Sequence, residues 1–127
     1  MTILYAEDDD EDRELMSEAL KEIDPSISCI VAHHGQNALE ILSESDELPD
    51  YIFLDVNMPV MDGKKCLKEL KKDTRYKEIP VIIYSTTSNE QEIEELYALG
   101  ASNFIRKHND YANMCSTLMK FVKFAQR

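Results

Sequence analysis

The sequence predicts an α/β fold, a doubly wound parallel sheet of five strands in a (βα)₅ order. Short apolar runs rich in β-branched and aromatic residues occur five times, and segments with helical periodicity separate them. Two of the runs, residues 51–54 and 81–84, are apolar throughout, as in strands buried on both faces. The 127 residues suit one domain of five units, whereas an eight-unit barrel needs about 250 residues.

The elements follow in order along the chain. The expected strands are residues 3–6, 27–31, 51–54, 81–84 and 103–105. Apolar residues at helical spacing form stripes over residues 15–23, 38–42, 67–70, 93–99 and 114–125. Pro25 stops the first stripe, and Gly100 closes the fourth in a C-cap position. Strands that alternate with helices in this way predict right-handed crossovers on both faces of a parallel sheet.

Composition restricts the kinds of function. The net charge is −11, from 25 acidic and 14 basic residues, which argues against nucleic-acid binding. No apolar run approaches the roughly 20 residues of a membrane span, and the N-terminus lacks the basic segment of a signal peptide. Cys29, Cys66 and Cys115 show no metal-ligand spacing, so free thiols are expected. These features predict a cytoplasmic protein without membrane insertion.

Polar and charged residues follow four of the expected strands. Glu7 and Asp8 follow the first strand, Asp55 the third, Ser85 the fourth and Lys107 the fifth. In an open α/β sheet, ligands bind beyond the carboxyl ends of the strands, so these side chains are expected to meet. Crowded carboxylates repel one another and favour a cation. Mg²⁺ prefers oxygen ligands of this kind and often binds phosphate oxygens as well.

This combination predicts phosphoryl transfer. A carboxylate neutralised by a metal ion is a competent nucleophile for phosphorus, which makes Asp55 the candidate acceptor. Lys107 and the hydroxyl of Ser85 are the groups available to offset the charge of the equatorial phosphoryl oxygens.

Four segments of the chain resemble the signature blocks of bacterial two-component response-regulator receiver domains. They are LYAED at residues 4–8, FLDVNMPVMDG at 53–63, VIIYST at 81–86 and GASNFIRK at 100–107. The resemblance spans essentially the whole chain at the usual spacing. It implies one receiver domain over residues 1–127, with the flavodoxin-like strand order 2-1-3-4-5.

The resemblance also implies a role for each matching residue. Asp55 would accept a phosphoryl group from a sensor histidine kinase or a histidine phosphotransfer protein. Asp8, Asp55 and the backbone carbonyl of Asn57 would bind Mg²⁺ or Mn²⁺, and Glu7 would act on the metal through water. Asn57 also matches a variable position that influences phosphoryl hydrolysis in the family, as does Thr87.

Three further positions are implied as switch or phosphoryl contacts. Ser85 and Phe104 match the switch residues, and Lys107 matches the lysine that pairs with the phosphoryl oxygens. Phe104 lacks a tyrosine hydroxyl, so a switch there would work by packing alone. His108 stands where the family usually has a proline after a cis peptide bond. A non-proline cis bond costs about 2.5–4 kcal/mol, so the Lys107–His108 isomer, and with it the place of Lys107, is left open.

Other polar residues have simpler interpretations. Residues 9–12 are expected to be the solvated, acidic start of a helix. His33 and His34 are expected to be loop residues, because adjacent side chains on an extended chain point apart. Asp62 and Gly63 are expected to turn the chain into the third helix.

The leading hypothesis is a stand-alone response regulator, and not an enzyme, that switches a protein-interaction face when phosphorylated. The resemblance places that face on the fourth helix, fifth strand and fifth helix, for an unidentified downstream protein or a homodimer. The tracts at residues 85–88 and 97–100 resemble small stand-alone receivers, some of which serve photoreceptor kinases.

Two alternatives remain. One is a degenerate receiver that binds proteins constitutively. The other is a Mg²⁺-dependent aspartyl-phosphate phosphatase of the haloacid-dehalogenase type, which would need a general acid where Asn57 stands. A flavin site is set aside, because the loop after the first strand is acidic.

Overall fold

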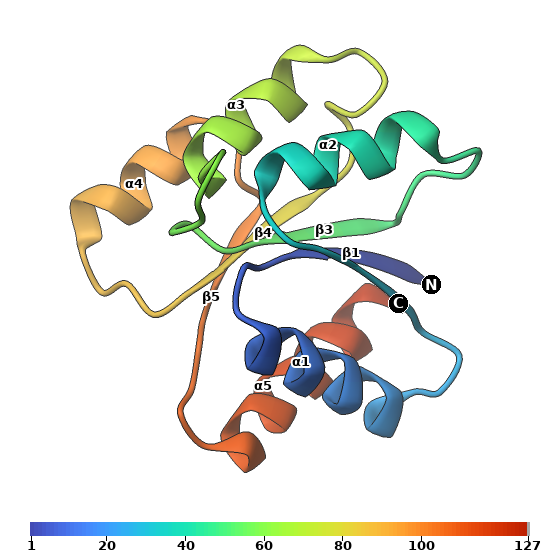
Figure 1. Cartoon of the computed structure of the whole chain (residues 1–127). Helices are drawn as coiled ribbons and strands as arrows, with labels where there is room; N and C mark the ends of the chain where they lie inside the picture. Colours follow the sequence, from blue (N-terminus) through green and yellow to red (C-terminus); the bar gives the residue numbers. More distant parts are fainter. Residues whose placement is uncertain (127) are drawn as a thin grey trace.

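The computed structural model describes residues 1–126 and contains the expected parallel sheet (Figure 1). The five strands lie in the order β2-β1-β3-β4-β5, which confirms the predicted topology. Their bounds are β1 Thr2–Ala6, β2 Ser28–Ala32, β3 Tyr51–Leu54, β4 Val81–Ser85 and β5 Asn103–Arg106. The expected domain end at Arg127 lies outside the described residues.

Helices cover both faces of the sheet. α1 and α5 lie on one face, while α2, α3 and α4 lie on the other (Figure 1). Their bounds are α1 Asp10–Ile23, α2 Gly35–Glu44, α3 Gly63–Lys72, α4 Glu90–Ala98 and α5 Tyr111–Ala125. This doubly wound arrangement places every loop that follows a strand at the same edge of the sheet.

A polar side chain caps the N-terminus of each helix and accepts a hydrogen bond from a backbone N–H of the first turn. The caps are Asp9, His34, Asp62, Asn89 and Asp110. The capping role of His34 agrees with its interpretation as a loop residue. Gly100 follows α4 with φ 114°, a conformation that side chains with a Cβ rarely adopt, so its expected role in ending the helix is confirmed.

The central strands are buried on both faces, and this fixes the positions of their ends. Side chains alternate between two apolar clusters: Leu54 and Ile83 pack beneath α2, α3 and α4, while Phe53 and Ile82 pack against α1 and α5. β4 is buried along its entire length, as its apolar sequence predicts. The residues that leave the carboxyl ends of these strands therefore start from a rigid platform.

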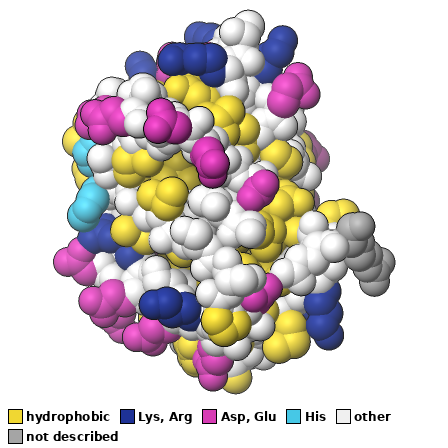
Figure 2. All heavy atoms as spheres, turned by 90° about the vertical axis from the view of Figure 1, so that its right-hand side faces the viewer, with side chains coloured by type: hydrophobic (Ala, Val, Ile, Leu, Met, Phe, Trp, Pro, Cys, Tyr) yellow, Lys and Arg dark blue, Asp and Glu magenta, His cyan; other side chains and the backbone are white. Residues whose placement is uncertain are grey.

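The end of the molecule near both termini is a mixed surface. Figure 2 shows hydrophobic side chains there in patches between acidic and basic ones. Within residues 1–126, no helix has both the length and the apolar character needed to cross a membrane.

Candidate functional site

Three carboxylates meet at the carboxyl edge of the sheet. Ala6 at the end of β1 pairs with Leu54 at the end of β3, so the residues that follow are neighbours. The backbone N–H of Asp55 donates to the carbonyl of Ala6 at 3.1 Å. One carboxylate oxygen from each of Glu7, Asp8 and Asp55 lies within 4.8 Å of the others. The structure thus brings together the acids that the sequence placed on separate strands.

Glu7 is the most enclosed of these acids, with 1% of its surface exposed. Its Oε1 accepts hydrogen bonds from the Tyr5 hydroxyl at 3.1 Å and from Lys107 Nζ, and its Oε2 accepts one from the Asp8 N–H at 3.0 Å. Burial raises the pKa of Glu7 to about 8, although the Lys107 hydrogen bond acts in the opposite direction. Burial therefore favours the protonated form of Glu7, and a positive charge beside it favours the ionised form.

Asp55 is also buried, and its two oxygens have different surroundings. Oδ1 accepts the Val56 N–H at 2.9 Å, while Oδ2 lies 3.6 Å from Lys107 Nζ. Gly63 packs against its backbone so closely that a Cβ would collide with the carbonyl oxygen of Asp55. Asp62 and Gly63 therefore have the structural role expected of them, and Gly63 also holds the peptide of the candidate acceptor in place.

Lys107 reaches into the acidic cluster from the end of β5. Its Nζ donates to Glu7 and, at 3.1 Å, to Asp12 Oδ2, and it lies 5.6 Å from the centre of the Tyr84 ring. Burial lowers the pKa of Lys107, but the Glu7 hydrogen bond and the Asp55 charge outweigh this effect and raise it. No cis peptide bond occurs in residues 1–126, so the Lys107–His108 bond is trans.

Two residues of this site were missed in the sequence. Asp12 was interpreted only as part of a solvated helix start, yet it accepts a hydrogen bond from Lys107. Arg13 is buried and donates from Nη1 to the Glu7 carbonyl at 2.6 Å, while Nη2 pairs with Asp10.

The expected switch residues lie on the two strands next to the site, Ser85 on β4 and Phe104 on β5. Ser85 is buried, its Oγ accepts the Thr87 N–H at 3.3 Å, and its carbonyl accepts the Lys107 N–H at 2.9 Å. Phe104 lies opposite Ile83 in the sheet and is half-buried against the cluster beneath α2, α3 and α4. Asn57 is exposed in the loop after β3. The functional roles of these residues stay predictions.

The loop between β3 and α3 contains strained backbone. Val60 has φ 65°, and the Met61 N–H donates to the Pro59 carbonyl at 2.7 Å, as in a tight γ-turn centred on Val60. A β-branched residue rarely adopts this conformation, and strain of this kind is concentrated near functional sites. This strain cannot be read from the residues of the loop, because its path is set by its two anchored ends.

The donor set fits a divalent cation. Three carboxylates meet at one point, and oxygen ligands of this type suit Mg²⁺ and Mn²⁺. Burial, and after it the neighbouring Asp55, raises the pKa of Glu7, and a bound cation would favour the ionised form of this carboxyl. The arrangement combines a partly shielded aspartate, an acidic cation site and an ammonium group, which are the components needed to receive a phosphoryl group.

Comparison with known proteins agrees with this geometry. The response regulator receiver domain family matches residues 3–119. The chain is 30% identical to the response regulator Rcp1 of Synechocystis sp., with 96% of this chain and 86% of Rcp1 covered. It is 29% identical to the chemotaxis protein CheY1 of Helicobacter pylori, with 84% of this chain and 85% of CheY1 covered.

Solved structures give the same result. The phosphorylated cyanobacterial phytochrome response regulator RcpA superposes with a TM-score of 0.91 at 29% identity, covering 98% of this chain and 93% of RcpA. The Mn²⁺-bound form of Rcp1 superposes with a TM-score of 0.86 at 27% identity, covering 97% and 92%. The chain therefore belongs to the response regulator receiver domain family of two-component signalling.

Proposed function

We propose that this protein is a single-domain response regulator that accepts a phosphoryl group on Asp55. One observation carries the proposal: Glu7, Asp8, Asp55 and Lys107 converge at one edge of the sheet from three different strand ends. The likeness to the response regulator Rcp1 supports a role of this kind. A cytoplasmic location and phosphorylation by a histidine kinase or phosphotransfer protein are parts of the same proposal.

The proposed cation ligands are Asp8, Asp55 and the backbone carbonyl of Asn57. Asp8 is exposed, so its carboxylate is accessible to a hydrated ion. Both oxygens of Glu7 already accept hydrogen bonds from the protein, which favours contact through water. Mg²⁺ or Mn²⁺ would supply positive charge to the attacking carboxylate and to the phosphoryl oxygens.

Asp55 Oδ2 is the proposed nucleophile, because Oδ1 already accepts the Val56 N–H. Oδ2 forms a bond to phosphorus while the bond from phosphorus to the donor breaks, and the donor leaves with that electron pair. Lys107 would move from its carboxylate partners to a phosphoryl oxygen, and the Ser85 hydroxyl would donate to another. The protein is thus the acceptor in the transfer and not a multiple-turnover enzyme.

The proposed output face is formed by α4, β5 and α5. Tyr97 on α4 and Phe124 on α5 are exposed, with 71% of Phe124 accessible, and the Tyr97 hydroxyl donates to Asn103 on β5 at 3.5 Å. Ser85 ends β4, which lies between β3 and β5, and Phe104 lies on β5 itself; we propose that these two residues transmit the switch. The occupant would be a downstream protein or a second copy of the chain.

Intact mass measurement after incubation with Mg²⁺ and acetyl phosphate tests the proposal. We expect the mass of one phosphoryl group to be added, and we expect EDTA or Asp55→Asn to prevent it. A degenerate receiver would gain no mass. A phosphatase would release phosphate over many turnovers, although Asn57 leaves it without a general acid at the expected position. Either of these results would contradict the proposal.

A further inference from the structure

Asp12 holds Lys107 from outside the carboxylate cluster. It lies on the first turn of α1, and its Oδ2 accepts from Lys107 Nζ at 3.1 Å. Its side chain is 41% exposed, in contrast to the enclosed Glu7 and Asp55. Lys107 therefore has one carboxylate partner on the helix and two partners at the strand ends.

These partners would not respond alike to a bound cation. A divalent ion among Glu7, Asp8 and Asp55 repels the ammonium of Lys107 from that cluster. Asp12 is not one of the three clustered acids, so its attraction for the ammonium persists. Phosphorylation would then place a second anionic acceptor, the phosphoryl group, in competition with Asp12.

We propose that Asp12 is a positioning residue that retains Lys107 before phosphorylation and competes with the phosphoryl group for it. The inference rests on the proposed function of Asp55. The proposal has a direct consequence. Neutralising Asp12 removes a competitor for Lys107, so the phosphoryl-bound state becomes more stable relative to the unmodified state. The magnitude follows from the partly exposed pair, for which measured couplings correspond to changes of about 1.5- to 5-fold.

The test compares Asp12→Asn with the wild-type protein in binding beryllofluoride, a phosphoryl mimic, at saturating Mg²⁺. We expect the affinity to rise about two- to fivefold in a calorimetric titration. Glu11→Gln is the matched control. Glu11 is exposed on the same turn, loses the same charge, and makes no ion pair or side-chain hydrogen bond within residues 1–126. Asp12→Glu, which restores the carboxylate, should return the affinity toward the wild-type value.

A second readout needs no phosphoryl mimic. With Mg²⁺ alone, the NMR resonance of Lys107 Nζ should shift in Asp12→Asn and not in Glu11→Gln. Equal effects of the two substitutions, or an unchanged or lower beryllofluoride affinity in Asp12→Asn, would overturn the inference while leaving the proposed function intact. Failure of the wild-type protein to bind beryllofluoride would instead overturn the proposed function and the inference with it.

Discussion

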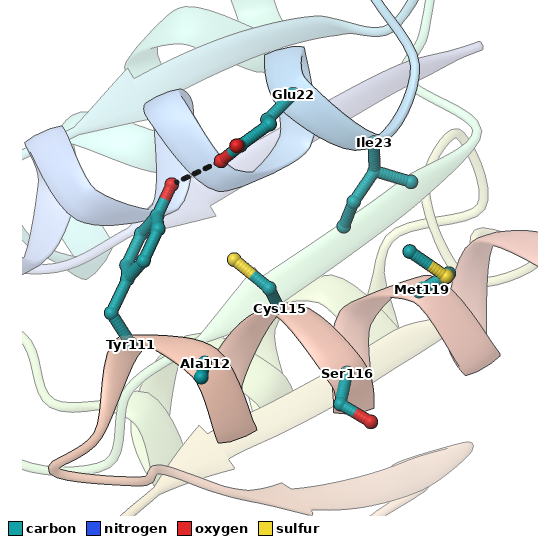
Figure 3. Close-up of a pocket in the computed structure, with 7 residues that line it drawn as sticks. All are labelled: Glu22, Ile23, Tyr111, Ala112, Cys115, Ser116 and Met119. Carbon is teal, nitrogen blue, oxygen red and sulfur yellow. Dashed lines mark hydrogen bonds between the residues drawn. The ribbon is translucent and has the colours of Figure 1, made fainter.

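Two regions adjoin opposite ends of α1, and they differ in chemistry. At the N-terminal end, Asp12 faces Lys107 and the acidic crevice, which is formed by Glu7, Asp8 and Asp55. At the C-terminal end, a groove of about 480 Å³ lies between α1 and α5 (Figure 3). Ile23, Cys115 and Met119 line this groove, and the Tyr111 hydroxyl donates across it to Glu22 Oε2 at 2.9 Å.

The comparison shows that charge convergence, and not volume, marks the chemical site. The groove is roomy, but its lining presents no set of side chains aimed at a common point. The crevice contains two largely buried charged groups, Glu7 and Lys107, and the pKa values of both are raised. Buried charges are costly, so a fold retains them where they act. Four substitutions test this contrast.

The largest effect is expected from Gly63→Ala. The added Cβ would collide with the carbonyl oxygen of Asp55, which belongs to backbone and cannot move without displacing the end of β3. We expect the free energy of unfolding to fall by about 2–4 kcal/mol in urea titrations. Met119→Ala in the groove is the control and should cost less than about 1 kcal/mol, since Met119 is 42% exposed. Similar losses for both would remove the structural distinction between the two regions.

Lys107→Met should strengthen Mg²⁺ binding by about tenfold, which corresponds to about 1.4 kcal/mol. The ammonium now neutralises Glu7 and Asp55, and its removal leaves those charges for the cation to balance. Calorimetric titration with Mg²⁺ measures the change. Lys120→Met, a neutralisation on α5 away from the crevice, serves as the control. Weaker Mg²⁺ binding by Lys107→Met would contradict the view that Lys107 and the cation compete for the charges of Glu7 and Asp55.

Val60→Gly should stabilise the protein by about 1 kcal/mol. Its φ of 65° is unfavourable for a β-branched residue and accessible to glycine, and this gain exceeds the extra chain entropy that glycine loses. Urea unfolding measures the effect. Val60→Ala, which retains a Cβ, should recover little of it. A stability decrease for Val60→Gly would show that the turn is not strained.

Tyr111→Phe should have the smallest effect. It removes the hydrogen bond from Tyr111 to Glu22 across the groove, at a partly exposed position. The free energy of unfolding should therefore fall by about 0.5 kcal/mol or less. The rate of phosphorylation by acetyl phosphate should not change. A marked change in that rate would connect the groove to the crevice and weaken the contrast between them.

Most of the fold was predictable because apolar patterning and burial determine it. The strands β3 and β4, near the centre of the sheet, were located correctly, and β2 was placed one residue early. The reason is that Ile27 is buried like a strand residue, but its N–H bonds to Asp24 in the preceding turn. Within the crevice, Glu7, Asp8, Asp55 and Lys107 were found because parallel strands end at one edge.

What the sequence did not reveal depends on tertiary geometry. Asp12 stands in an acidic run that suits any helix N-terminus, and only the path of the Lys107 side chain distinguishes it from its neighbours. The strain at Val60 depends on how the loop is held between β3 and α3. The groove could not be predicted from the sequence either. Apolar residues at helical spacing do not indicate whether the side chains of two facing helices fill the space between the helices.

The most direct test of the account is to locate the phosphoryl group. After incubation with Mg²⁺ and acetyl phosphate, borohydride reduction converts an aspartyl phosphate to homoserine, which peptide mass spectrometry can assign to one residue. We expect homoserine at Asp55 and at no other aspartate. Homoserine at Asp8 or Asp12, or a phosphoryl group on a serine or histidine with Asp55 unmodified, would contradict it.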